Sequence, residues 1–312
     1  MDIAFIAAPL DTFKTSKDST YAMMREAGRR EHSLYFIEPR DLYWRSGVHA
    51  QVRRFSLFDG KVPWYELEEP QERPLNSFDV VMLRTDPPFD MEYLYSTYLL
   101  ELAEDAGAHI VNRPRAVRDF NEKLAIARFP DLIVPTLVSC DLLRLRTFVT
   151  EEQDTVVKPL SEMGGSSVFR LRRNDPNLNV ILETITQNGR RTVLVQRFIP
   201  EIMEGDKRIL IVDGEPVPYA LARIPARDDF RGNLAAGGRG EARLLSHRDR
   251  EIALLLGRRL RGEGLLLVGL DVIGDYLTEI NVTSPTGMQE IFRQTGFDTA
   301  EMMINVFESR FG

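Results

Sequence analysis

The chain has 312 residues, of which 43% are apolar and 28% are charged, so its composition is that of a globular protein with two or three packed units. A net charge of −7 argues against nucleic acid as the main partner, and a single cysteine, Cys140, excludes an internal disulfide and favours a reducing compartment, the cytoplasm. The sequence shows no run of about 18 apolar residues and no basic, apolar leader, so neither a membrane span nor a secretory signal is expected.

The first 120 residues alternate between apolar runs and helical spacing, which is typical of βαβ units and predicts a mainly parallel sheet. Residues 47–69 break this pattern and are interpreted as a β-hairpin insertion. The predicted strands are residues 2–8, 33–38, 78–84 and 109–112, and the predicted helices are residues 18–30, with a start signal at Asp18 and Ser19, and 91–106.

A helix is predicted from residue 115 to about 128, and a domain boundary is expected near residue 120. Beyond it the pattern is that of an α+β protein with antiparallel sheets, and Asp213-Gly214 is a strong hairpin turn. The predicted strands are residues 155–159, 167–171, 193–199, 207–212 and 217–223. The expected domains are 1–120, 121–200 and 201–312.

Lys158 ends an apolar strand and precedes a turn containing Gly164, Gly165 and Ser166. Paired glycines let the backbone approach a ligand and aim its N–H groups at oxyanions, and a neighbouring lysine is a good phosphate ligand. The residue order is not that of a P-loop. Each feature alone is as compatible with an ordinary hairpin and a solvated strand end.

Residues 224–240 have neither strand nor helix periodicity, and loops of this length are typically functional lids or disordered segments. Arg223, Arg231 and Arg239 line this segment, and their positive charge would favour its closure over a bound phosphate. Arg208 stands inside an apolar strand and needs a partner, either a phosphate or a structural carboxylate. Arg84 ends a parallel-type strand, where open sheets bind ligands, although a salt bridge would also explain it.

Residues 264–286 are predicted to form a hairpin around Gly274-Asp275 that carries Asp271, Glu279 and Asn281. Glu279 and Asn281 share one strand face, and Asp271 joins them if it lies opposite Glu279, which predicts a loop of three or five residues. Three oxygen donors on one face suit Mg²⁺. The alternative is a solvated hairpin with ordinary polar alternation.

The four histidines show no metal-ligand spacing, no Ser-His-Asp or Cys-His arrangement stands out, and Cys140 is interpreted as a packed hydrophobe. Clustered Lys, Arg, Gly and acidic residues without a nucleophile indicate phosphoryl chemistry, in which positioning and charge neutralisation dominate.

With these motifs the chain resembles the bacterial glutathione synthetases of the ATP-grasp ligase family along nearly its whole length. Two strings are narrow signatures, Arg84-Thr-Asp-Pro-Pro-Phe-Asp90 and Arg231-Gly-Asn-Leu-Ala-Ala-Gly-Gly-Arg-Gly240. Further matches include Lys17-Asp-Ser19, Asn121-Glu-Lys123, Gly205-Asp-Lys-Arg208, Gly269-Leu-Asp271 and Thr278-Glu-Ile-Asn-Val-Thr-Ser-Pro-Thr286. The resemblance implies an ATP-grasp fold behind an N-terminal parallel-sheet domain.

The same resemblance implies ligation of γ-glutamylcysteine to glycine, with ATP converted to ADP and phosphate through an acyl phosphate. It implies Lys123 and Lys158 as phosphate ligands, Gly164, Gly165 and Ser166 as a phosphate loop, Gln196, Phe198 and Ile199 at adenine, and Asp271, Glu279 and Asn281 as ligands of two Mg²⁺ ions, for which Mn²⁺ could substitute. The catalytic set is Arg208, Arg223 and Arg231, and the substrate set is Lys17, Asp18, Ser19, Arg84, Arg223, Arg231, Ser284 and Thr286. It also implies a homo-oligomer, expected to be a tetramer.

Three alternatives remain open at this point. One is another ATP-grasp carboxylate–amine ligase with a different donor or acceptor. The second is a nucleotide-binding regulator that has kept the fold without the reaction. The third is a kinase that stops at the acyl phosphate and forms no amide.

Overall fold

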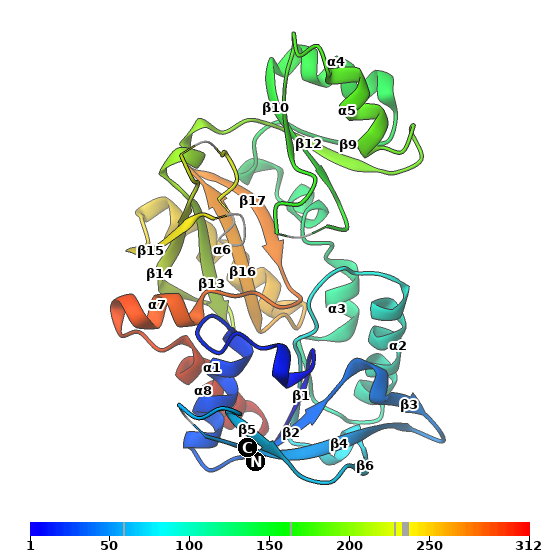
Figure 1. Ribbon diagram of the computed structural model, residues 1–312, viewed down its shortest axis with the longest axis vertical. Coiled ribbons are helices and arrows are strands. Elements are labelled where there is room, and N and C mark those ends of the chain that lie inside the picture. The colour runs from blue at the N-terminus through cyan, green and yellow to red at the C-terminus, as the bar shows by residue number, and fades with distance from the viewer. Residues whose placement is uncertain (59, 163, 228, 233–236) are drawn as a thin grey trace.

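The computed structural model describes residues 1–312 except residues 59, 163, 228 and 233–236. Three sheets follow one another along the long axis of the molecule, with helices packed on their faces (Figure 1). The mixed α/β and α+β character predicted from the sequence is therefore confirmed. In the part of the chain that the structure describes, no helix combines the length and the apolar character needed to cross a membrane.

The first sheet has β1 (Asp2–Ile6) near its centre, parallel to its neighbours β2 (Ser33–Ile37) and β7 (Val80–Leu83), and β8 (Ile110–Val111) is parallel to β7. The predicted hairpin insertion is confirmed, because β4 (Val48–Leu57) pairs antiparallel with β5 (Tyr65–Leu67). Since β4 also pairs antiparallel with β2, the sheet is mixed rather than purely parallel. The other strands at this edge are β3 (Leu42–Trp44) and β6 (Gln71–Pro74).

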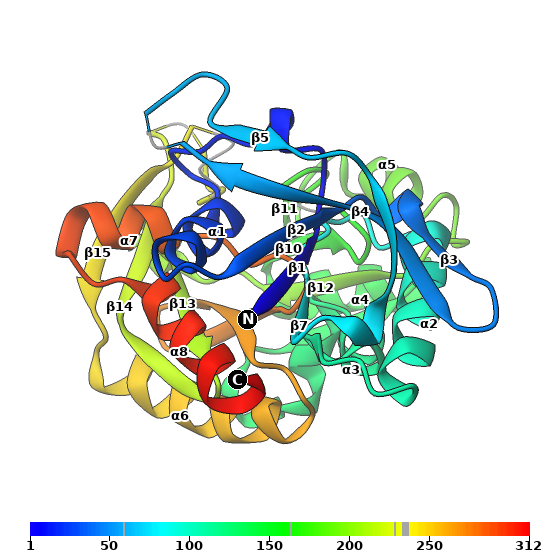
Figure 2. The same ribbon diagram turned by 90° about the horizontal axis from the view of Figure 1, so that it is seen from below.

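Both faces of β1 are buried, which explains its unbroken apolar run. Ile3 and Phe5 belong to a core shared with α1 (Ser19–Arg29) and α8 (Thr299–Phe311), whereas Ala4 and Ile6 belong to a core shared with α2 (Met91–Asp105). Helices α1 and α8 lie side by side, and the two ends of the chain lie close to each other (Figures 1 and 2).

The helix predicted at residues 115–128 is wrong as a single element. α3 (Pro114–Asp119) ends first, and a separate 3₁₀-helix covers Leu124–Arg128. Asn121 causes the break, because its side-chain oxygen accepts hydrogen bonds from the backbone nitrogens of Lys123 and Leu124, at 3.3 and 3.0 Å. Lys123 consequently stands at a turn, at the start of the 3₁₀-helix.

The second sheet forms the upper unit in Figure 1 and is antiparallel, in the order β11-β10-β12-β9. Two helices cover one face and enclose an apolar core that includes Leu145, Val157 and Leu182. The elements are β9 (Thr136–Ser139), α4 (Leu142–Glu152), β10 (Asp154–Pro159), β11 (Phe169–Arg172), α5 (Leu178–Ile185) and β12 (Val193–Arg197).

The third sheet is antiparallel in the order β15-β14-β13-β16-β17. α6 packs on one face and α7 on the other. The elements are β13 (Asp206–Val212), β14 (Glu215–Ile224), β15 (Arg239–Leu244), α6 (His247–Gly262), β16 (Leu267–Ile273), β17 (Tyr276–Asn281) and α7 (Met288–Thr295). The predicted Asp213-Gly214 turn between β13 and β14 is confirmed.

The predicted lid at residues 224–240 is shorter than expected, because Ile224 ends β14 and Arg239 begins β15. The two residues pair across these strands, and the Arg239 side chain is exposed beside Glu241. Strand pairing at both ends therefore removes Arg239 from the loop. Residues 228 and 233–236 of the predicted lid lie outside the described residues.

The β16–β17 hairpin confirms one prediction and corrects another. Asp271 does lie opposite Glu279, but the loop has two residues, Gly274 and Asp275, instead of three or five. A β-bulge at Thr278 supplies the extra residue that changes the parity. The Thr278 hydroxyl donates to the carbonyl of Asp271 at 3.1 Å and so stabilises the bulge.

Candidate active site

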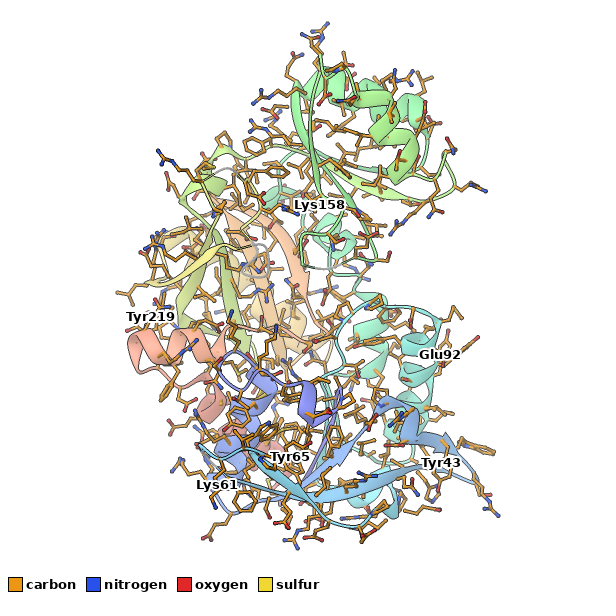
Figure 3. All side chains as sticks on the ribbon, viewed as in Figure 1. Tyr43, Lys61, Tyr65, Glu92, Lys158 and Tyr219 are labelled. Carbon is orange, nitrogen blue, oxygen red and sulfur yellow. The ribbon has the colours of Figure 1, made fainter. Side chains whose placement is uncertain are left out.

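A cavity of about 330 Å³ lies between the second and third sheets. Lys158 stands where the upper unit meets the body of the molecule (Figure 3). The structure brings together, on the wall of this one cavity, all nine residues predicted to bind the nucleotide: Lys123, Lys158, Gly164, Gly165, Ser166, Gln196, Phe198, Ile199 and Arg208. Their gathering from strands, turns and a 3₁₀-helix defines the candidate site.

A row of alternating charges crosses the floor of the cavity, on the third sheet. Arg208 on β13 lies opposite Asp271 on β16, and its Nε and Nη2 donate to the two Asp271 oxygens at 2.5 and 3.0 Å. Arg223 on β14 lies opposite Asp206, with Nη2 2.5 Å from Asp206 Oδ2 and 2.8 Å from Asp271 Oδ2. Glu279 on β17 ends the row, opposite Asp271.

The two buried aspartates of this row differ in proton affinity. Burial alone would raise the pKa of Asp271, but Arg208 and Arg223 outweigh it and hold the pKa well below its usual range. Burial raises the pKa of Asp206 to about 6, because Arg223 opposes the rise only in part and the Asp271 and Glu279 charges add to it. One Asp206 oxygen, Oδ1, is buried without a partner among the described residues.

The two lysines approach the cavity from different elements. Lys123 is buried, donates to the backbone oxygen of Glu162 and lies 3.8 Å from Glu279 Oε1. Lys158 Nζ lies 3.2 Å from Gln196 Oε1, and the Gln196 amide in turn donates to Thr136 Oγ1 at 3.1 Å. Both ammonium groups are therefore held toward the cavity by the protein itself.

The predicted metal ligands satisfy the chemistry of a hard cation. Asp271 and Glu279 face each other, and Asn281 follows two residues later on the same strand face. The Asn281 amide nitrogen donates to the carbonyl of Gly269 at 3.1 Å, which leaves its oxygen available. In this structure the arginines supply the charge beside Asp271, and the described residues contain no cluster of three His, Cys, Asp or Glu side chains suited to a metal.

Arg231 connects two walls of the cavity. Its Nη1 donates to the carbonyl of Gly165 at 3.4 Å. Its Nε and Nη2 donate to the Asp229 carboxylate at 2.7–3.1 Å. This hydrogen-bonded pair lowers the pKa of Asp229 to about 2. The described part of the 224–240 segment thus already reaches the glycine-rich turn.

The residues predicted on the substrate side divide into two groups. Ser284 and Thr286 lie on the cavity wall together with Arg223 and Arg231. Lys17, Asp18, Ser19 and Arg84 are not part of the wall that the described residues form.

Three of this second group are engaged in the fold instead. Asp18 caps α1 by accepting from the Thr20 and Tyr21 nitrogens at 2.6 and 3.0 Å. Ser19 accepts from the Met288 nitrogen, and Arg84 donates to Thr20 and to the carbonyl of Pro285 at 3.0 Å each.

Sequence reasoning missed five acidic residues of the cavity wall: Asp86, Glu122, Glu162, Asp206 and Glu290. Glu122 accepts from both the backbone nitrogen and the hydroxyl of Thr283, at 3.2 and 2.7 Å, and so ties the turn before Lys123 to the end of β17. Asp206 and Glu122 belong to motifs recognised in the sequence, and their adjacency to Arg208 and Lys123 was the available signal. For Glu290 there was none.

The order of the strands, the glycine-rich turn and the charged cavity together define an ATP-grasp ligase. Solved ATP-grasp structures agree at the level of the fold: a D-cycloserine synthetase superposes with a TM-score of 0.69 at 15% identity, with both chains fully covered. The Chryseobacterium gregarium RiPP-associated ATP-grasp ligase superposes with a TM-score of 0.64 at 13% identity, covering 99% of this chain and 97% of its own.

The sequence matches two family models, the prokaryotic glutathione synthetase N-terminal domain over residues 1–118 and the prokaryotic glutathione synthetase ATP-grasp domain over residues 122–296. The glutathione synthetase of Nitrosomonas europaea is 55% identical, with 99% of this chain and 98% of that protein covered. That of Pseudomonas aeruginosa is 53% identical, with 95% and 93% covered. The chain belongs to the prokaryotic glutathione synthetase family.

Proposed function

We propose that this chain joins γ-L-glutamyl-L-cysteine to glycine, forming glutathione, ADP and phosphate. The observation that carries the proposal is the single cavity in which Lys123, Lys158 and the arginine row face the oxygen donors of β16 and β17. Relatives that share more than half of their residues with this chain bear the name glutathione synthetase. Membership of the family makes the chain an ATP-dependent carbon–nitrogen ligase. The proposal adds the identity of its two substrates, γ-glutamylcysteine and glycine.

The reaction proceeds in two steps. The cysteinyl carboxylate attacks the γ-phosphorus of ATP, forming a carboxyl–phosphate bond as the bond to ADP breaks. The glycine ammonium loses a proton, and the resulting amine attacks the activated carbonyl, displaces phosphate and loses a second proton as the amide forms. Negative charge accumulates on the phosphoryl oxygens in both steps, so the site must provide fixed positive charge there.

The protein supplies that charge from several elements. Lys123 and Lys158 hold the nucleotide phosphates beside the backbone of Gly164, Gly165 and Ser166. Arg208, Arg223 and Arg231 neutralise the charge on the transferring phosphoryl group and on the substrate carboxylates. Arg208 and Arg223 already converge at Asp271, so both guanidinium groups lie beside the position where the phosphoryl oxygens would bind next to that carboxylate.

Asp271, Glu279 and Asn281 would hold Mg²⁺, and two ions, or Mn²⁺ in their place, fit the number of oxygen donors. When bound, such ions neutralise and orient the phosphate oxygens as Lewis acids. For Asp271 to serve as a ligand, at least one of its two arginines must turn toward the phosphates. The ion pairs therefore keep Asp271 ionised until the nucleotide binds.

The remaining predicted residues take positioning roles. Gln196, Phe198 and Ile199 lie where the adenine is expected. Lys17, Asp18, Ser19, Arg84, Ser284 and Thr286 form the side of the dipeptide. Arg84 supports this side through the carbonyl of Pro285, and Ser19 supports it through the backbone nitrogen of Met288. The 224–240 segment excludes water, which would otherwise hydrolyse the acyl phosphate.

We also retain the division into 1–120, 121–200 and 201–312 as functional units. Residues 1–120 carry the dipeptide side, residues 121–200 carry the glycine-rich nucleotide loop, and residues 201–312 carry the metal-binding hairpin and the lid. A cytoplasmic location is part of the proposal, supported by the single cysteine, and a homotetramer or other homo-oligomer is the expected assembly.

Steady-state assays of phosphate release test the proposal. Purified protein is supplied with Mg-ATP and a panel of dipeptides and amino acids, and γ-glutamylcysteine plus glycine should give the highest kcat/KM. Turnover only with another donor or acceptor would identify a different carboxylate–amine ligase. Tight ATP binding without turnover on any pair would identify a regulator.

The metal assignment has its own variant. Glu279→Ala should lower kcat at least about 100-fold, because a carboxylate that would hold the Mg²⁺ ions is lost. Isothermal titration should show weaker Mg-ATP binding. Glu251→Ala is the matched control, since Glu251 is exposed on α6 and pairs with Arg248, and it should behave like the wild type. Equal activity of Glu279→Ala and the control would refute the assignment.

A further inference from the structure

Glu290 has no role in the chemistry described above, yet it lies on the wall of the same cavity. It belongs to the first turn of α7, and the residue is 9% exposed. One of its oxygens, Oε2, is buried and accepts no hydrogen bond from any described residue. A buried carboxylate oxygen without a partner is costly, so its retention calls for an explanation.

The position of Glu290 in the cavity is fixed by the N-terminal loop. The Met288 nitrogen donates to Ser19 Oγ at 3.3 Å, and the Gln289 amide donates to the carbonyl of Thr15 at 2.8 Å. These bonds hold the first turn of α7 against residues 15–19, next to Ser284 and Thr286 on the wall. Glu290 therefore lies on the side of the cavity assigned to the dipeptide.

The other acids of the wall are already accounted for. Asp206 and Asp271 pair with arginines, Glu162 with Arg191, Glu279 with Lys123, and Glu122 accepts from Thr283. Asp86 is exposed to solvent. Asp206 also has a buried oxygen without a partner, but its other oxygen pairs with Arg223. Among the described residues of the wall, Glu290 is the acid that combines a buried unpaired oxygen with the lack of any ion pair.

A helix-capping role explains only part of this arrangement. An acid in the first turn of a helix is stabilised by the helix dipole, and the backbone amide of Glu290 itself lowers the pKa of the carboxyl. Burial has the larger effect and raises that pKa, and neither Lys17 nor Arg293 reaches ion-pair distance. A solvated glutamate would serve the helix as well without the cost of burial.

The missing partner must be a hydrogen-bond donor, and a cation would match the carboxylate best. The substrates offer two ammonium groups, one on glycine and one on the γ-glutamyl residue. The glycine nitrogen must lose a proton before it attacks, and a buried carboxylate would hold it in the unreactive ammonium form. The γ-glutamyl ammonium stays charged throughout and lies at the end of the dipeptide away from the reacting carboxylate.

We propose that Glu290 binds the α-ammonium group of the γ-glutamyl residue and thereby selects a γ-glutamyl donor over one that lacks the amine. The inference rests on the proposed function and adds a specificity determinant to it. Because the contact is remote from the transferring phosphoryl group, it acts on dipeptide binding and leaves the ATP and glycine sites as they are.

The test compares γ-glutamylcysteine with N-glutarylcysteine, which differs only in lacking the amine. The wild-type enzyme should prefer the γ-glutamyl donor by about 100-fold in kcat/KM, because a built polar site discriminates strongly against a missing partner. In Glu290→Gln this preference should fall at least about tenfold, through a higher KM for the dipeptide, with the KM values for ATP and glycine unchanged. A residue that only stabilises α7 would lower kcat/KM for both donors equally.

Two further variants complete the experiment. Glu301→Gln changes an exposed glutamate in the first turn of α8 and should keep the full preference. Glu290→Asp keeps the charge and should retain most of the preference, so it tests the inference even if Glu290→Gln does not fold. A wild-type enzyme inactive on γ-glutamylcysteine would refute the proposed function. An active wild-type enzyme without the preference, or a Glu290→Gln enzyme that retains it, would refute the role of Glu290 alone.

Discussion

At the scale of single residues, the site is organised by where its ion pairs lie within one sheet. Arg208, Arg223, Asp206 and Asp271 come from three neighbouring strands, and each acid lies opposite an arginine. In this register the buried charges neutralise one another before any ligand arrives. Burial would be costly for an isolated charge, but it is tolerable for a paired network. The same register aims the arginines at the point where phosphoryl charge is expected.

Asp206 gives this network a measurable pH dependence. Its folded pKa of about 6 lies above the ordinary pKa of an aspartate carboxyl, 3.8, so the folded state holds the proton more tightly than the unfolded state. Stability is therefore highest below the unfolded pKa and is lost as pH rises from about 4 through 6. The linkage amounts to on the order of 1–2 kcal/mol between pH 5 and pH 8.

The prediction is that Asp206→Asn, which cannot ionise, removes this part of the pH profile. The difference in unfolding free energy between Asp206→Asn and the wild type should shift in favour of the variant on going from pH 5 to pH 8, as measured by urea unfolding of the ligand-free protein. Glu241→Gln, at an exposed ion pair, is the control and should show little such shift. A pH-independent difference for Asp206→Asn would contradict the burial of an ionisable Asp206.

At the scale of elements, the β16–β17 hairpin shows how far a sequence pattern reaches. The alternation of polar and apolar residues put Glu279 and Asn281 on one face, and the expectation that Asp271 shares it predicted Asp271 opposite Glu279. It could not distinguish a longer loop from a two-residue turn with a bulge, since either one inserts an odd residue. The bulge depends on the Thr278 hydroxyl bonding to the Asp271 carbonyl, a contact that the pattern does not encode.

The same limit explains the other differences. The break after α3 follows from a side-chain bond of Asn121 to the backbone, which competes with a helical pattern that otherwise continues. Asp206 and Glu290 were missed because their importance comes from burial and from an unpaired oxygen, both of which are properties of the folded chain. Motif spacing identified the charged residues of the cavity wall. It did not separate them from residues such as Asp18, Ser19 and Arg84, which lie outside the wall and are engaged in the fold.

Gly269 on β16 offers a test of this element. A Cβ atom built there would lie 2.8 Å from Arg208 Cδ and 2.9 Å from Pro285 Cβ. Gly269→Ala should therefore displace Arg208 from Asp271, lowering kcat at least about tenfold and stability by about 1–3 kcal/mol. Activity assays and thermal unfolding measure the two effects.

Gly262→Ala is the matched control, because a Cβ at that helical position meets nothing within 4 Å. The control should keep full activity and unchanged or slightly higher stability. Wild-type kcat in Gly269→Ala would show that Arg208 does not need its observed position.

At the scale of the whole molecule, Asn112 joins the first sheet to the third. It follows β8, and its side chain accepts from the Leu266 and Leu267 nitrogens and donates to the carbonyls of Leu267 and Val282, at 2.8–2.9 Å. All four bonds are buried. They fix the hairpin that carries the predicted metal ligands relative to the dipeptide side of the molecule.

Asn112→Ala should lower the free energy of unfolding by about 2–4 kcal/mol, because it leaves buried backbone groups without partners. Asn76→Ala, which removes one exposed side-chain bond to Ala106, should cost less than about 1 kcal/mol. Chemical denaturation of both variants measures the difference. Equal stabilities would show that the two sheets are held together without Asn112.

The central claim is that the cysteinyl carboxylate is activated by direct phosphorylation in one cavity. The most direct test uses γ-glutamylcysteine with both oxygens of the cysteinyl carboxylate labelled with ¹⁸O, together with Mg-ATP and glycine, and analyses both products by mass spectrometry. The predicted result is one ¹⁸O atom in each phosphate released and one retained in the new amide of glutathione. Unlabelled phosphate would mean that ATP is cleaved by water, and it would contradict the mechanism.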